Sequence, residues 1–262
     1  MNCLSDRKFE NLLLVDVTVG GESGTALFDS GAQQTVVSEG FLKRSNGCIT
    51  EGSVAAGNSN GDSLSLKNGL LRTVMIGECV LTELEVLVIA DDMLTAEDNE
   101  GHVLQADMLL GYDVIGRFRW SYSSVENTLD IGQPDEAASD GNVYYNEFPT
   151  IRVTIGAQSF IAGLDTGHTE TVLSCRLKPL LGDMAYTEDV VAGIGSTKKA
   201  YVQAVPELVI GFEGTAVVLR DITVQDEIYG APEEMDLLLG MDLLYGKDWE
   251  LDPSAGGLKI RQ

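Results

Sequence analysis

The sequence has few histidines and few prolines: His102 and His168 are its only histidines, and it holds six prolines in 262 residues. The two histidines do not correspond in the internal repeat described below, so a histidine-based metal centre or a Ser-His-Asp triad is hard to build. Four cysteines stand at wide, unequal spacings without a C-x-x-C pair. This pattern argues against a zinc site and a redox pair, and reduced thiols are the expectation.

Basic residues are also scarce, because 17 Lys and Arg stand against 41 Asp and Glu, for a formal net charge of −24. Such a surface repels phosphate backbones and anionic membranes, so we expect no nucleic acid and no membrane as partner. The charge fits a solvated surface or a preference for basic peptides. No apolar run reaches the length of a membrane span, and the first residues lack a signal-peptide pattern, which predicts a cytoplasmic protein.

Glycine and β-branched residues are plentiful. The 29 glycines and runs such as LLLVDVTV and ELEVLVIA predict many short strands joined by tight turns. Short helices are expected at 39–44, 111–118 and 241–245, and the hydrophobic content of 44% is enough for two cores.

The chain contains a long internal repeat. Residues 15–38 align without a gap on residues 151–174 with 10 identities in 24 positions, where composition alone would give roughly one or two. Residues 107–113 then align on 236–242, in a copy shortened by seven residues somewhere between Gly195 and Asp236. We therefore predict an N-terminal lobe at 1–133, a linker or interface segment at 134–148 and a C-terminal lobe at 149–262.

Each copy contains an Asp-Ser/Thr-Gly tripeptide, beginning at Asp29 and at Asp165. One such tripeptide is typical of an ordinary turn. Here both copies follow an apolar stretch, precede Thr-Val and are paired downstream with Leu-Leu-Gly, at 109–111 and 238–240. Two carboxylates roughly 3 Å apart can share one proton, so that one activates water while the other protonates a substrate.

These motifs resemble the aspartic peptidases, above all the retropepsin-like group, over essentially the whole chain. The resemblance implies a mainly-β fold of two closed β lobes related by a pseudo-twofold axis, with one short helix in each. Retroviral enzymes build the site from two identical chains, whereas this sequence looks like two such halves fused. The resemblance further implies an aspartic endopeptidase that uses water as nucleophile and acts on a peptide or protein substrate without a metal or other cofactor. The fusion of the two halves implies a monomer.

The resemblance also assigns the site residues. Asp29 and Asp165 are the expected catalytic pair. The hydroxyls of Ser30 and Thr166 are expected to hydrogen-bond across the lobe interface. The neighbouring glycines let backbone pass close to the carboxylates; they are Gly31 and Gly167.

Substrate-binding residues are expected on two flaps and beside the aspartates. The flap residues are Ala56, Gly57, Asn58, Gly193, Ile194 and Gly195, although ordinary hairpins would have the same residue types. Ala32 and His168 follow the two tripeptides. His168 stands where alanine is usual, either as a bystander on the cleft wall or with a role in substrate selection or pH tuning.

Two other interpretations compete with the peptidase. A protein with a protease-like fold could bind a peptide or scaffold an assembly without cutting, although such a protein has no chemical need for both aspartates. Alternatively, each lobe could pair with a lobe of another chain. The short linker and the difference between Ala32 and His168 favour pairing within one chain.

Overall fold

The computed structural model describes residues 2–57, 61–97, 101–135, 141–145, 148–181, 184–193, 196–226, 228 and 235–261. Its strands form where apolar and polar residues alternate in the sequence. In β1 (Leu14–Val19), Val15, Val17 and Val19 are buried while Asp16 is exposed. This alternation gives the strand one face for the core and one for solvent.

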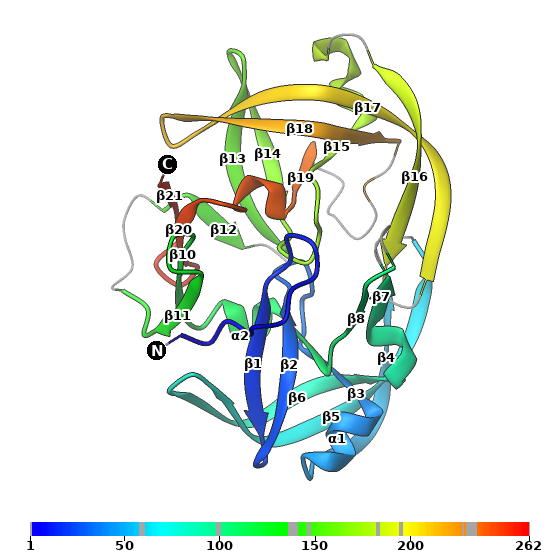
Figure 1. Ribbon diagram of the computed structural model, residues 1–262, viewed down its shortest axis with the longest axis vertical. Coiled ribbons are helices and arrows are strands. Elements are labelled where there is room, and N and C mark those ends of the chain that lie inside the picture. Colours follow the sequence, from blue (N-terminus) through cyan, green and yellow to red (C-terminus); the bar gives the residue numbers. More distant parts are fainter. Residues whose placement is uncertain are drawn as a thin grey trace.

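Among the described residues, six strands close the first lobe into a barrel (Figure 1). In order around the barrel they are β1, β2 (Glu22–Phe28), β9 (Met108–Leu110), β3 (Val36–Ser38), β6 (Cys79–Ile89) and β5 (Ser63–Ile76). The ring closes because β1 pairs with β5 as well as with β2. A further strand, β4 (Cys48–Gly57), pairs with β5 and makes a long hairpin.

The second lobe repeats this ring in the described part of the chain. Its barrel strands are β13 (Pro149–Ile155), β14 (Gln158–Leu164), β19 (Leu237–Leu239), β15 (Val172–Ser174), β18 (Thr215–Gln225) and β17 (Ser196–Phe212). Pairing of β13 with β17 closes the ring, and β16 (Ala185–Gly193) makes the second long hairpin. The predicted mainly-β fold with two closed lobes is confirmed.

The lobes differ in length at one connection. Residues 90–107 join β6 to β9 and include η1 (Asp91–Leu94), β7 (Thr95–Glu97) and β8 (Val103–Gln105). The corresponding connection from β18 to β19 is residues 226–236, which is seven residues shorter. The whole shortening of the second copy therefore falls at this connection.

The predicted helices are present, with some additions. α1 (Glu39–Arg44) begins at Ser38, whose Oγ accepts from the N–H of Phe41 at 3.2 Å. The remaining segments are α2 (Tyr112–Ile115), η2 (Cys175–Leu180) and η3 (Met241–Leu243). η2 corresponds to α1 but contains Pro179, which lacks an N–H and disfavours an α-helix. No helix in the described ranges is long and apolar enough to span a membrane.

A four-stranded sheet joins the two halves. Its order is β11 (Thr128–Gly132), β10 (Arg119–Ser123), β20 (Asp248–Asp252) and β21 (Gly257–Arg261). The central pair, β10 with β20, brings together strands from opposite halves of the chain. Phe28 of the first barrel packs against Trp120 and Trp249 of this sheet, with ring centroids 4.9 and 6.3 Å away. The cores of the lobes are therefore continuous.

The segment predicted as a linker contains β12 (Val143–Tyr145), which pairs with β13 of the second barrel. Tyr145 also stacks on Tyr112 of α2, with ring centroids 4.5 Å apart and planes 6° from parallel. Part of the segment therefore extends the second sheet and contacts the first lobe.

Candidate active site

Each candidate aspartate directly follows a barrel strand, Asp29 after β2 and Asp165 after β14. In each lobe the strand that carries Leu-Leu lies parallel to the strand that precedes the aspartate. β9 pairs with β2 in the first lobe, and β19 pairs with β14 in the second. The N–H of Asp29 donates to the carbonyl of Leu110 at 3.0 Å, and that of Asp165 to Leu239 at 2.9 Å. The Leu-Leu-Gly motif thus fixes the start of the two aspartate loops, residues 29–32 and 165–168.

Ser30 and Thr166 join the two aspartate loops across the lobe boundary. The N–H of Ser30 donates to Oγ1 of Thr166 at 2.9 Å, and the N–H of Thr166 donates to Oγ of Ser30 at 3.0 Å. Each hydroxyl then donates to the opposite lobe: Ser30 to the carbonyl of Leu164 at 2.7 Å, and Thr166 to that of Phe28 at 2.8 Å. Both side chains are buried, so these four hydrogen bonds act away from water and hold the loops in register.

The carboxyl groups of Asp29 and Asp165 hydrogen-bond each other, and each lies over the glycine of the opposite loop. A Cβ on Gly31 would lie 2.5 Å from both carboxyl oxygens of Asp165, and a Cβ on Gly167 would lie 2.5 Å from Oδ1 of Asp29. Oδ1 of Asp29 also accepts from the N–H groups of Gly31 and Ala32, at 3.0 and 3.1 Å. Only glycine leaves room for this arrangement.

Burial raises the pKa of both carboxyls above the usual range for aspartate. At Asp29 the charge of Asp165 adds to the rise in pKa, while the N–H groups of Ala32 and Gly31 oppose it. A hydrogen bond between two carboxyls needs a proton on one of them, since carboxylates only accept. The pair therefore retains one proton at a pH where ordinary carboxyls have lost theirs. Both residues keep part of their surface exposed.

A second pair of aspartates, both half-buried, supports the loops, and the sequence alone assigned it no role. Oδ1 of Asp113 accepts from the N–H and Oγ1 of Thr35, at 2.9 and 2.8 Å. In the second lobe the N–H and Oγ1 of Thr171 donate to the carboxyl of Asp242, at 3.0 and 2.8 Å. All four residues are identical between the copies, which is the signal that could have found them.

A family model described as "gag-polyprotein putative aspartyl protease" matches residues 15–117. This span runs from β1 through α2 and contains Asp29 and the first Leu-Leu-Gly. The second lobe repeats the same ring of strands and the same aspartate loop. The family match thus covers the first lobe, and the second lobe shares its ring of strands and its aspartate motif. A search of curated proteins finds no match.

The fourth residue of each aspartate loop differs between the two lobes. Ala32 and His168 both lie half-buried beside the aspartates. The N–H of Ala32 donates to the carboxyl of Asp29, while that of His168 lies 3.2 Å from the backbone carbonyl of Asp165. Nδ1 of His168 lies 2.8 Å from the carbonyl of Glu170.

The predicted flaps fall on the two long hairpins. Ala56 and Gly57 lie at the end of β4, and Ala56 packs against the buried side chains around Leu66. Gly193 ends β16 and pairs with Ser196. Asn58, Ile194 and Gly195 lie outside the described residues. In Figure 1, β4 and β16 extend along the same side of the molecule, beside β7 and β8.

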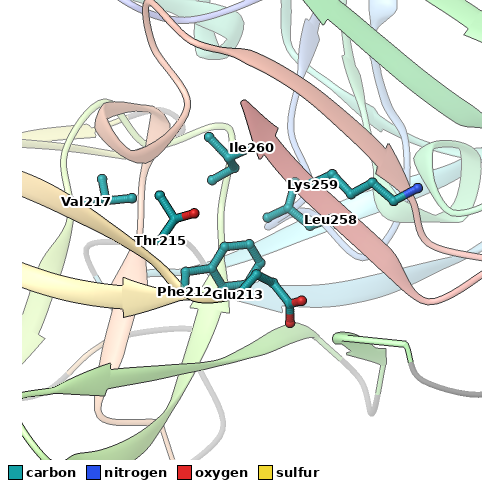
Figure 2. Close-up of a pocket in the computed structure, with 7 residues that line it drawn as sticks. All are labelled: Phe212, Glu213, Thr215, Val217, Leu258, Lys259 and Ile260. Carbon is teal, nitrogen blue, oxygen red and sulfur yellow. The ribbon is translucent and has the colours of Figure 1, made fainter. Parts of the chain in front are cut away.

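Two features apart from the aspartates concern ligand binding: metal-ligating groups and a small surface cavity. The described residues contain no group of three or more His, Cys, Asp or Glu side chains placed to hold a metal ion. A cavity of about 160 Å³ lies between the β17–β18 turn and β21 (Figure 2). Its lining includes Phe212, Val217 and Leu258, and none of the candidate site residues.

Proposed function

We propose that this retropepsin-like protein is an aspartic endopeptidase whose catalytic pair is Asp29 and Asp165. The observation that carries the proposal is the hydrogen-bonded pair of carboxyls, one from each lobe, with the pKa of both raised by burial. A carboxyl and a carboxylate side by side are the acid and the base that metal-free amide hydrolysis needs.

The proposed reaction uses the shared proton in a cycle. The ionised carboxylate takes a proton from water as the water oxygen bonds to the amide carbon, while the protonated carboxyl gives its proton to the carbonyl oxygen. In the resulting diol the carbon–nitrogen bond breaks. The nitrogen leaves with one proton from the pair. The pair takes one proton back from a hydroxyl of the diol as the new carboxyl group forms, so it again holds one proton. The macroscopic pKa values belong to the pair and to neither residue alone.

The supporting groups favour a preorganised site. Ser30 and Thr166 hold the loops by buried hydrogen bonds, so little reorganisation is needed when substrate binds. The proposed substrates are extended peptide segments. The β4–β5 and β16–β17 hairpins lie on the same side of the molecule, where their backbone groups could pair with an extended peptide. One chain supplies both aspartates, so the proposed active form is a monomer.

Asparagine variants of the pair test the proposal. Asp29→Asn and Asp165→Asn should each lower the turnover of a peptide library by several powers of ten, because an amide can neither accept the proton from water nor return it. The double variant should be scarcely slower than either single variant, since the pair acts as a unit. A statine-type transition-state mimic should inhibit the parent.

Asp16→Asn is the matched control, because Asp16 is an exposed residue of β1 and loses the same charge. It should retain parental turnover. Near-parental activity in either variant of the pair would exclude the two-aspartate mechanism. A parent that binds library peptides without cutting them would instead support a protease-like binding or scaffold protein.

A further inference from the structure

A residue of the first lobe contacts the second aspartate loop. The side chain of Asn11, shortly before β1, donates from Nδ2 to the backbone carbonyl of Thr169 at 2.7 Å. Thr169 directly follows the second aspartate loop, residues 165–168. Figure 1 shows the deep-blue segment that leads into β1 at the boundary between the lobes. The contact therefore links the two halves of the chain beside the candidate catalytic pair.

The first lobe fixes the backbone around Asn11. The N–H of Leu12 donates to the carbonyl of Phe9 at 3.1 Å, so Asn11 lies in a tight turn. Phe9 is buried against Leu14 of β1 and Leu104 of β8. β8 belongs to the connection that is seven residues longer in the first lobe. The amide of Asn11 is therefore presented to the second lobe from a packed turn that this longer connection supports.

The carbonyl of Thr169 also has a partner inside the second lobe. The N–H of Asp242 donates to it at 3.2 Å, and the N–H of Met241 donates to the carbonyl of His168 at 2.8 Å. These two bonds attach the end of the loop to η3. A carbonyl oxygen has lone pairs for two donors, so Asn11 adds a second donor from the opposite lobe. Without Asn11 the carbonyl still has a partner, but the loop loses this link to the first lobe.

The second polar atom of the Asn11 side chain works against stability. Oδ1 is buried and has no hydrogen-bond partner among the described residues. A buried acceptor without a partner has lost its bonds to water and gained none in the protein, which destabilises the folded state. A leucine side chain has a similar shape and no such acceptor. Packing alone therefore does not favour asparagine here, and the contact with Thr169 gives the residue its use.

We propose that Asn11 is a positioning residue whose amide holds the second aspartate loop from the first lobe and so keeps Asp165 in place against Asp29. The bonds between Ser30 and Thr166 fix the loops at their second residues, whereas Asn11 acts at the far end of one loop. Turnover is sensitive to small displacements of reacting groups. The effect on turnover rests on the proposed function, whereas the contact itself does not.

Asn11→Leu tests this inference, because leucine keeps the shape of asparagine and removes both the donor and the acceptor. The variant should lower kcat on library peptides by about tenfold and leave KM within about twofold, since the loop shifts while the hairpins do not. Its Tm should equal or exceed the parental Tm, because the buried acceptor is gone. A marked fall in Tm would show that Asn11 serves stability, and would overturn the inference.

Asn142→Leu is the matched control. Nδ2 of Asn142 donates to the carbonyl of Leu258 at 2.9 Å, and its Oδ1 accepts from the N–H of the same residue at 2.7 Å. Both polar atoms of this asparagine have partners on β21. The variant should therefore lower Tm and retain the parental kcat, which is the opposite of the result expected for Asn11→Leu.

Hydrogen exchange provides a readout that does not depend on activity. In Asn11→Leu, residues 165–171 should exchange several-fold faster than in the parent, because the loop opens more readily without its link. Parental exchange at 165–171 overturns the inference. In an active enzyme, a parental kcat in Asn11→Leu or an equal loss of kcat in Asn142→Leu also overturns it. If the parent cuts no peptide, the peptidase proposal fails, and exchange at 165–171 alone decides whether Asn11 holds the loop.

Discussion

Single hydroxyl groups hold the two aspartate loops together. Oγ1 of Thr166 accepts one buried hydrogen bond from Ser30 and donates another to Phe28. Thr166→Val keeps the shape but leaves a buried N–H and a buried carbonyl without partners, which should lower the free energy of unfolding by about 2–5 kcal/mol. Urea unfolding measures the loss.

The matched control for this hydroxyl is Thr166→Ser, which restores the residue that the first lobe uses at Ser30. It should recover most of the lost stability and activity. A serine variant as unstable as the valine variant would mean that the methyl group, and not the hydrogen bonds, matters at this position.

At the scale of elements, the strands and hairpins could be predicted because alternating residues and glycine turns are local signals. The duplication also singled out the repeated Leu-Leu-Gly, which the structure places in and after β9 and β19, beside the aspartate loops. The small β7–β8 pair was not predicted; it lies in the connection that is seven residues shorter in the second copy. The four-stranded sheet was also missed, because pairing of β10 with β20 leaves no trace in either strand's own sequence.

The equivalent tryptophans of β10 and β20 allow a matched comparison. Nε1 of Trp120 donates to the carbonyl of Ile115 at 2.9 Å, whereas the buried Nε1 of Trp249 has no hydrogen-bond partner among the described residues. Trp120→Phe should therefore lower the free energy of unfolding by about 1 kcal/mol more than Trp249→Phe. Denaturant titration of the two variants measures this difference. Equal losses would show that packing alone determines the cost.

For the whole molecule, the aspartate pair links stability to pH. The pKa of Asp29 is raised in the folded protein, so its contribution to stability is fully present below the unfolded value and is lost as pH rises through the folded value. Asp29→Asn cannot ionise and escapes this loss. Relative to the parent, it should gain at least about 1 kcal/mol of unfolding free energy between pH 4 and pH 8.

General charge repulsion provides the competing explanation, because the chain carries a net charge of −24. Asp16→Asn removes the same charge from an exposed position, so thermal melts of both variants across pH separate the two effects. If Asp16→Asn gains as much stability as Asp29→Asn, the gain comes from net charge and not from the aspartate pair.

The route of the chain through both lobes sets the order in which the site can be completed during synthesis. The first barrel holds all its strands once Leu110 has been made, but Asp165 is held by the carbonyl of Leu239, which follows much later. β20 and β21 complete the shared sheet later still. A ribosome-bound chain that already carries both aspartates therefore still lacks the strands that bring them together, so the proposed site is not assembled until β19 and β20 have been made.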